Sequence, residues 1–432
     1  MSSELSLKLI DPQNYTQNQR AEFRLPSGNL YRSNMKLLNV GFASTTAGTD
    51  GFSYINGALV CIKQISLMDG SKVLDSINNF NLLQGFKSYN VNNMKACDLK
   101  TSLEKTKMGC TSTQDEIAIN NNVQNFKAWD MYIGAADPAT TERDTEKAYV
   151  DLSDLFPLLR NLGLIHTGLF KNMRIVLEFQ TRDSLYQPSE PTADHQTTQP
   201  LLAIHQIENA EEAAEYLRNF KGVQYTSTEN DQVTIPSVPN VSGTNLTPTQ
   251  TNEFRINGFN NKTVNRMLIS KNSTVPVDAT PTHRTSPKYG ESASQCMFSQ
   301  RLQCRINGAN LLPSNGITGD RQRLGALNDA YGVCVTPLGG EIPNFVDSIN
   351  SYADGSQDRN DVAGRLDYYG LQTGGKRVQD LQFTYERKGV HNAADADQSK
   401  GRFNQQLRFN VLGEVIKQIR PNGRGGYSVV YV

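Results

Sequence analysis

Short apolar segments separated by Gly, Asn, Asp and Pro form the dominant pattern along the chain. The segments 35–42 and 59–68 have the length and composition of β-strands. Within Met173–Phe179, alternate residues are apolar on one side, while Arg174 and Glu178 lie on the other. Such alternation is typical of a strand that packs one face into the core of a β-sandwich. The pattern therefore predicts an all-β protein.

Helical patterns are few and short. Apolar stripes and capping residues predict helices over 77–86, 153–162, 208–220 and 322–331. Ser153 is the expected N-cap of the second helix, and Gly163 is its expected end. Helices of this length fit the connections between strands.

Two dipeptides predict tight hairpin turns at similar places in the two halves of the chain. Asp69-Gly70 and Asn307-Gly308 each lie between two apolar segments. Asp-Gly and Asn-Gly favour such turns because both central residues of the turn adopt positive φ. We therefore assign structural turns to Asp69, Gly70, Asn307 and Gly308.

The two turns belong to a wider internal resemblance. A short predicted helix follows each of them. The segment 35–38 resembles 266–269, and the strand at Ile175 resembles the strand at Leu407. The members of all three pairs are separated by similar lengths of chain. Three elements in the same order at similar offsets predict a duplicated β-sandwich domain.

A polar, proline-rich segment separates the two halves. Residues 187–200 lack any hydrophobic period, which is typical of a linker. We expect an N-terminal domain over 1–186, a linker and helix over 187–222, and a C-terminal domain over 223–432. Long polar stretches lie at 272–292, 354–364 and 389–401. We expect them to form surface loops that make contacts with other molecules.

Three segments carry a resemblance to a known family. The sequence Asp11-Pro-Gln-Asn-Tyr-Thr-Gln leads into a strand at Phe23, and residues 55–70 lead into the helix around 79–85. Residues 150–156 then lead to the strand that begins at Met173. Together the segments resemble the double jelly-roll major capsid proteins of the adenovirus-hexon lineage, and they are most similar to those of polinton-like viruses and virophages. The resemblance covers the whole chain in layout and includes no signature motif.

The resemblance implies two tandem eight-stranded antiparallel jelly rolls with short helices in the connecting loops. It also implies a structural major capsid protein, three copies of which form a pseudo-hexameric capsomer of an icosahedral double-stranded DNA virus. The implied partners are further copies of the chain, penton and minor capsid proteins, and weak contact with the genome or an inner membrane. The implied location is the virion, after synthesis inside the host cell and without secretion.

Charge and composition narrow the class of protein. Lys and Arg number 43, as do Asp and Glu, so the formal net charge is zero. Proteins that bind nucleic acid strongly use a surplus of positive charge, which this chain lacks. No apolar run reaches the ~18 residues that a membrane span requires. The start, Met1-Ser-Ser-Glu-Leu, has no basic region followed by an apolar core, so we expect no signal peptide.

Two segments come close to ligand-binding motifs. Residues 370–377 nearly match a phosphate-binding loop, but an arginine follows Lys376 where the motif requires a hydroxyl residue. The segment from Asp395 begins like a calcium loop, but Lys400 replaces the required glycine and Gln406 the required glutamate. A Gly-Gly turn and a solvated acidic loop are the better interpretations.

Cysteine and histidine spacing also fails to indicate a metal site. The cysteines are residues 61, 97, 110, 296, 304 and 334. They include no CxxC pair, and we interpret them as free buried thiols. The histidines, at 166, 195, 205, 283 and 391, lack the spacing of zinc ligands. We therefore expect no enzymatic activity, no cofactor, no metal ion and no small-molecule substrate.

Other functions remain open at this stage. A carbohydrate-binding or host-attachment β-sandwich would use exposed aromatic residues such as Tyr289, Tyr368 or Tyr369. A nucleotide hydrolase would use Lys376. A minor capsid protein at the vertices is a variant of the main hypothesis. The arginine–glycine segment 420–427 predicts a turn before the final strand, or a modest contact with nucleic acid.

Overall fold

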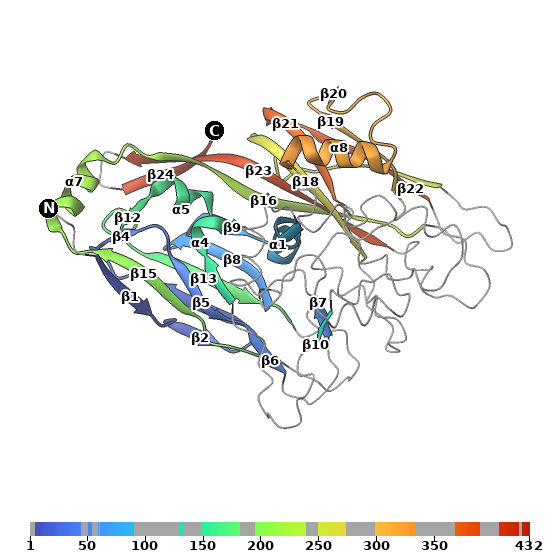
Figure 1. Cartoon of the computed structure of the whole chain (residues 1–432). Helices are drawn as coiled ribbons and strands as arrows, with labels where there is room; N and C mark the ends of the chain where they lie inside the picture. The colour runs from blue at the N-terminus through green and yellow to red at the C-terminus, as the bar shows by residue number, and fades with distance from the viewer. Residues whose placement is uncertain are drawn as a thin grey trace.

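Strands dominate the structure, a computed structural model. It describes residues 5–44, 51–53, 59, 61–89, 130–132, 148–181, 195–238, 249–273, 299–332, 368–388, 406–422 and 426–432. Within these ranges the strands pair antiparallel in several sheets, and the helices are short (Figure 1). The prediction of an all-β protein is confirmed.

The first half of the chain builds two main sheets. One has the strand order β11 (Ala148–Asp151), β5 (Lys36–Val40), β15 (Leu201–Ile207), β4 (Leu30–Arg32), β12 (Leu164–His166). In addition, β1 (Leu5–Ile10) pairs with β15. The other has the order β2 (Asn14–Thr16), β3 (Arg20–Arg24), β13 (Met173–Phe179), β8 (Ile62–Asp69), β9 (Lys72–Ile77). Two small ladders pair β7 (Gly51–Ser53) with β10 (Asp130–Tyr132), and β6 (Phe42–Ser44) with β14 (His195–Thr197).

The second half also builds two sheets. One has the order β21 (Tyr369–Val378), β18 (Lys262–Ser273), β23 (Leu407–Asn422), β16 (Val223–Ile235), and β24 (Gly426–Tyr431) pairs with the far end of β23. The other has the order β17 (Thr249–Arg255), β22 (Leu381–Lys388), β19 (Ser299–Ile306), β20 (Ala309–Asn310).

The two halves share one topology. The eight principal strands are β1, β3, β5, β8, β9, β11, β13 and β15 in the first half, and β16 to β23 in the second. Counted along the chain in each half, one sheet has the order sixth, third, eighth, first, and the other has the order second, seventh, fourth, fifth. Eight antiparallel strands divided in this way between two sheets form a jelly roll. We call the unit from β1 to β15 the N-terminal jelly roll and the unit from β16 to β23 the C-terminal jelly roll. The prediction of two tandem eight-stranded jelly rolls is confirmed.

One of the three internal matches from the sequence is wrong. The segments 35–38 and 266–269 fall in equivalent strands, β5 and β18. The strand at Ile175 is β13, whose counterpart is β22, whereas Leu407 begins β23. The sequence could not separate these strands, because a period of two identifies a half-buried strand and not the sheet to which it belongs.

The position of β15 bears on the expected domain limits. This strand lies inside the range 187–222 that we expected to be a linker and helix, yet it pairs with β1, β4 and β5 of the N-terminal jelly roll. We therefore propose that this jelly roll extends past residue 186 to Ile207. The connection to the C-terminal jelly roll then consists of α7 (Ala210–Asn219) and its flanks, with Asn209 as the N-cap.

The helix predicted over 153–162 is two helices, α4 (Leu152–Leu155) and α5 (Pro157–Leu162). Its N-cap is Asp151, whose Oδ1 accepts a hydrogen bond of 2.9 Å from the backbone N–H of Ser153. Phe156 is extended because a residue that precedes proline avoids the helical region. The helices predicted over 77–86, 208–220 and 322–331 correspond to α1 (Phe80–Tyr89), α7 and α8 (Asp320–Tyr331). Of these, α1 and α8 follow the equivalent strands β9 and β20.

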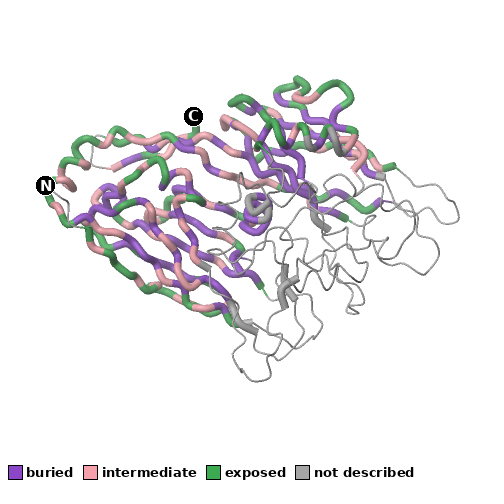
Figure 2. The backbone as a smooth tube through the Cα atoms, viewed as in Figure 1, coloured by how far each residue is buried: buried purple, intermediate pink, exposed green. Residues whose placement is uncertain are grey.

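Buried residues occur along the strands of both jelly rolls (Figure 2). Their apolar side chains form two core clusters. The first cluster includes Phe23 and Ile175 from one sheet and Leu37 and Leu202 from the other, and none of the four is exposed. The core cluster of the N-terminal jelly roll also includes residues of the second: Tyr225, Leu268, Leu327, Tyr368, Leu412, Ile419 and Tyr427. The two jelly rolls are therefore packed together through a continuous apolar contact.

Candidate functional site: the interface between the two jelly rolls

Aromatic rings form the first part of this interface. Phe86, on α1, lies edge-on to Tyr331, at 5.0 Å between ring centroids, and edge-on to Tyr368, at 5.3 Å. The Oη of Tyr368 donates a hydrogen bond of 3.1 Å to the carbonyl of Leu82. Edge-to-face pairs of this kind stabilise beyond the area they bury. Helix α1 of one jelly roll is thus fixed against the end of one helix of the other, α8, and against the residue that precedes β21.

The hairpin between β8 and β9 forms the second part. Tyr427, on β24, packs against Phe170 at 4.9 Å, and its Oη donates a hydrogen bond of 2.6 Å to Oδ2 of Asp69. The Nζ of Lys72 donates to the Tyr427 carbonyl at 3.3 Å and lies over the tyrosine ring. Burial, and then the neighbouring Asp69 carboxylate, raise the pKa of Tyr427 above its ordinary value. The phenol therefore stays protonated and serves as a donor.

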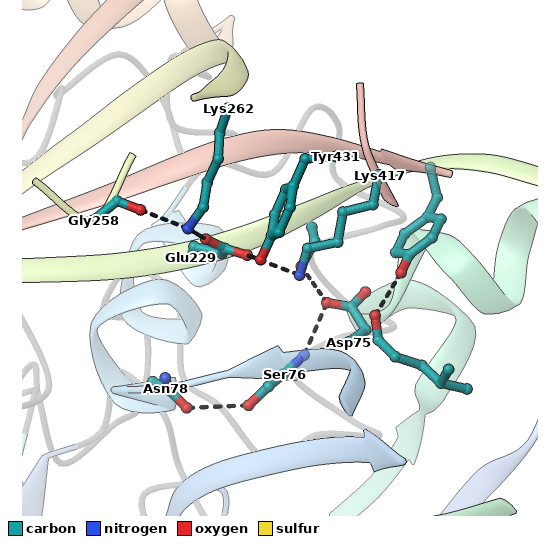
Figure 3. A network of polar contacts seen from close by, with 11 residues as sticks. Asp75, Ser76, Asn78, Glu229, Gly258, Lys262, Lys417 and Tyr431 are labelled. Atoms are coloured by element: carbon teal, nitrogen blue, oxygen red, sulfur yellow. Dashed lines mark hydrogen bonds and ion pairs between the residues drawn. The ribbon is translucent and has the colours of Figure 1, made fainter. Parts of the chain in front are cut away.

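A buried polar network forms the third part (Figure 3). Asp75, on β9, is 1% exposed and accepts a hydrogen bond of 2.6 Å from the Oγ of Ser227 on β16. That hydroxyl in turn accepts one of 3.1 Å from the Nζ of Lys417 on β23. Next to them, the Oη of Tyr225 donates to the Leu74 carbonyl at 2.5 Å. The network crosses from one jelly roll to the other.

Glu229 holds the C-terminal side of the network together (Figure 3). One of its oxygens lies 2.8 Å from the Nζ of Lys417, and the other lies 2.6 Å from the Nζ of Lys262. Tyr431 donates a further hydrogen bond of 2.7 Å to it. Burial alone would raise the pKa of Glu229, but the two lysines and the hydrogen bond from Tyr431 together outweigh burial, so this pKa lies below its ordinary value of 4.5. The carboxylate is therefore charged at neutral pH.

These contacts favour one relative orientation of the jelly rolls. Buried charges are costly unless each has its partners, so a shifted arrangement that broke the network would be penalised strongly. Sequence reasoning missed this set of residues. The available signal was a charge within an apolar strand, as in Val73-Leu74-Asp75 and Val415-Ile416-Lys417.

The structure places the predicted turn residues in two hairpins. Asn307 and Gly308 are the two residues between β19 and β20, with φ of 53° and 79°, as the Asn-Gly pattern predicts. In the other hairpin Asp69 pairs with Lys72, so the two central residues are Gly70 and Ser71, one position later than the sequence predicts. Asp69 instead uses its carboxylate to accept hydrogen bonds from Tyr427 and from the backbone N–H of Asn172.

We expect Gly308→Ala to lower the free energy of unfolding by roughly 1–2 kcal/mol, because an L residue at positive φ is strained although no atom lies within 4 Å of the added Cβ. Gly222→Ala should cost more, because its φ is +93° and the added Cβ would lie 2.3 Å from the Ile419 carbonyl oxygen. Urea unfolding of both variants measures the difference. Equal losses would show that the close approach at Gly222 is relieved at no cost.

Lys376 lies in a strand and not in a phosphate-binding loop. Residues 373–375 of β21 form a bulge opposite Asn265, in which Gly374 and Gly375 have φ of 68° and 71°. The predicted Gly-Gly turn is therefore a bulge, and β22 follows it rather than a helix whose N-terminus could face a phosphate. The segment 395–405 of the predicted acidic loop lies outside the described residues.

Potential metal ligands do not gather in the described part of the chain, where no group of three or more His, Cys, Asp or Glu residues could hold an ion. Cys61 and Cys304 are buried, and burial raises the pKa of Cys61 to about 12. Such a thiol is protonated and unreactive at neutral pH. The other four cysteines lie outside the described residues. No helix in the described ranges is long and apolar enough to cross a membrane.

Comparison with known proteins adds evidence at the level of structure alone. No family model matches the sequence, and no curated protein matches it. Solved capsid structures match along the whole chain. A chain of the PBCV-1 virus capsid matches at 11% identity and a TM-score of 0.54, over 100% of this chain and 98% of that one. The chain has the double jelly-roll fold of viral major capsid proteins.

Two further viral structures show the same double jelly-roll fold. The mavirus major capsid protein matches at 12% identity and a TM-score of 0.52, over 98% of this chain and 90% of that one. A chain of the Sputnik virophage matches at 8% identity and a TM-score of 0.56, over 99% of this chain and 88% of that one. Both jelly rolls are therefore included in each match, and the resemblance seen in the sequence is confirmed in the fold.

Proposed function

We propose that this protein is a structural major capsid protein that builds the shell of an icosahedral virus by associating with copies of itself. The observation that carries the proposal is the pair of jelly rolls with one topology, locked together by a buried interface. Capsid structures with this fold match over nearly their whole length. We place the protein in the virion and assign it no enzymatic activity.

The finer proposal is a trimer with a pseudo-hexagonal outline. Two equivalent jelly rolls in each of three copies give six similar units, which fit a lattice position with six neighbours. The zero net charge of the chain suits close packing, because like-charge repulsion would not accumulate between neighbours. We further propose a double-stranded DNA virus, with penton and minor capsid proteins as partners and weak contact with the genome or an inner membrane.

Light scattering and negative-stain imaging of the purified chain test this function. We expect a particle with three times the mass of one chain and a hexagonal outline, and shell fragments at high concentration. A protein that remains a monomer at every concentration, or that hydrolyses a nucleotide through Lys376, would contradict the proposal.

Carbohydrate binding has less support than a shell role. Of the aromatic residues that the sequence suggested for a sugar platform, Tyr368 is fully buried and Tyr369 is 3% exposed. A sugar platform requires rings that face solvent, and these two serve the interior instead. Tyr289 lies outside the described residues.

A further inference from the structure

Three short connections meet at one end of the C-terminal jelly roll. The backbone N–H of Asn307 donates a hydrogen bond of 2.9 Å to the Asp380 carbonyl, and its side chain donates one of 2.9 Å to the Arg377 carbonyl. The backbone N–H of Ile256 donates to the Leu381 carbonyl at 3.0 Å. These bonds hold the three connections together. The closed end of this jelly roll, as we call it, consists of residues 255–262, 305–310 and 376–381.

The closed end is basic, although the whole chain is neutral. It has one acidic residue, Asp380, and five basic residues: Arg255, Lys262, Arg305, Lys376 and Arg377. Lys262 is paired with Glu229, and Arg255 lies 3.5 Å from Asp380. The other three basic side chains belong to exposed residues, and no carboxylate among the described residues pairs with them. They are therefore available to an anionic partner.

The strand register places two of the arginines in one row. Arg255 and Arg305 lie opposite Gln382 on its two neighbouring strands, so the three residues share a face of the sheet. Neighbouring strands are about 5 Å apart, so the backbones at the two arginines are about 10 Å apart. Duplex DNA carries one phosphate charge for every ~1.7 Å of its axis, so a row of this width meets several phosphates.

The N-terminal jelly roll has an equivalent closed end, at residues 24–29, 69–72 and 167–173. The backbone N–H of Leu25 donates to the Met173 carbonyl at 3.0 Å, as Ile256 donates to Leu381 in the other unit. Arg24 is the last residue of β3, as Arg255 is of β17, and both Arg24 and Lys171 are exposed. The same end of each jelly roll therefore presents basic side chains to solvent.

Strand β24 connects the two closed ends. Its Tyr427 contacts Asp69 in the N-terminal unit. Tyr431, four residues later, lies beside Lys262, whose Nζ is 4.8 Å from the centre of the tyrosine ring (Figure 3). A strand rises about 3.4 Å per residue, so about 14 Å separates these two contacts. The two basic ends therefore adjoin, and one extended ligand can reach both.

We propose that the two closed ends form the surface through which the shell contacts the phosphates of its packaged nucleic acid. This inference rests on the proposed function as a shell protein and assigns residues to the genome contact. Exposed amides, which donate hydrogen bonds to phosphate oxygens, lie beside the basic side chains at Asn257, Asn310 and Gln379.

A lipid membrane fits the same surface less well. Proteins that lie on a membrane insert apolar side chains between the headgroups in addition to using basic ones. The closed end of the C-terminal jelly roll exposes no large apolar side chain. Its chemistry is that of a phosphate-backbone contact, which is independent of base sequence. A neutral chain makes this contact weakly, and the many copies in a shell strengthen it together.

Binding of a double-stranded DNA fragment to the associated full-length protein tests the proposal, with fluorescence anisotropy measured over a range of salt concentrations. The double variant Arg305→Gln with Arg377→Gln removes two exposed charges. Each lost phosphate contact reduces the slope of log K against log salt by about 0.9, so the slope should fall by about 2. The affinity near 0.1 M salt should fall roughly tenfold or more, for any DNA sequence.

The matched control is the double variant Arg20→Gln with Lys63→Gln. It removes the same charge from two exposed residues, which lie at the opposite ends of their strands: Arg20 begins β3, and Lys63 is the second residue of β8. Its DNA binding and salt dependence should resemble those of the wild type. Thermal unfolding of both double variants should show that they fold.

Three results would overturn the surface. The first is an equal loss of DNA binding in the two double variants, which would indicate a general effect of charge. The second is a wild type that binds vesicles containing phosphatidylserine but not DNA, and the third is a wild type that binds neither. In each case light scattering would still show the oligomer, and the shell function would stand. A wild type that never associates would overturn both.

Discussion

Replacement of Phe86 by alanine should lower the free energy of unfolding by roughly 3–5 kcal/mol, the usual cost of removing a buried phenylalanine ring. Phe86 is 4% exposed and touches Tyr331 and Tyr368 of the other jelly roll. The cavity would therefore open between the two units. We expect calorimetry to show two separate thermal transitions where the wild type shows one.

The matched control for Phe86 is Tyr368→Phe. This change keeps the ring beside Phe86 and removes the hydroxyl that donates a hydrogen bond to the Leu82 carbonyl. Its expected cost is about 1 kcal/mol, and the single transition should remain. If Phe86→Ala costs no more than Tyr368→Phe, the aromatic contact does not hold the jelly rolls together.

Lys417→Ala should lower the free energy of unfolding by about 3 kcal/mol, the low end of the range for breaking a buried ion pair. The low end applies because Glu229 keeps Lys262 as a second partner at 2.6 Å. The lysine side chain is 8% exposed, and its loss would leave Ser227 and Glu229 short of a donor. Chemical denaturation followed by intrinsic fluorescence measures the change.

The exposed pair of Arg160 and Asp154 provides the control for Lys417. Their side chains are 60% and 63% exposed, and Arg160→Ala should change stability by less than about 1 kcal/mol. A second readout is acid sensitivity. Because the pKa of Glu229 is lowered in the folded state, the stability it contributes is complete above pH 4.5 and is lost as the pH falls through the folded-state value. That acid-dependent loss should shrink in Lys417→Ala, and an unchanged pH profile would contradict this role for the network.

Local sequence signals identified the parts of the fold that depend on neighbouring residues. The alternation in Met173–Phe179 gave its strand, and Asn307-Gly308 gave its hairpin, because both depend only on a few adjacent side chains and their φ preferences. The same approach placed one turn a residue early at Asp69 and merged α4 with α5. The turn is shifted at Asp69, whose carboxylate makes tertiary contacts. The helix is divided at Phe156, which precedes a proline.

The interface residues could not be predicted in the same way. Asp75 and Ser227 are 152 positions apart, and Lys417 is a further 190 positions along the chain. Each residue alone resembles an ordinary polar residue of a strand. Their role becomes visible only when two sheets from different halves meet.

By itself, the sequence determined that the chain is all-β, that it is duplicated, and that it resembles double jelly-roll capsid proteins. These conclusions follow from hydrophobic period, turn chemistry and repeated order, which are written locally along the chain. Only the tertiary structure decided which strands are equivalent, which charges are buried between the jelly rolls, and that Leu5, Leu7 and Leu9 face solvent. The physical reason is that strand pairing and burial depend on residues far apart in sequence, whose meeting no local pattern encodes.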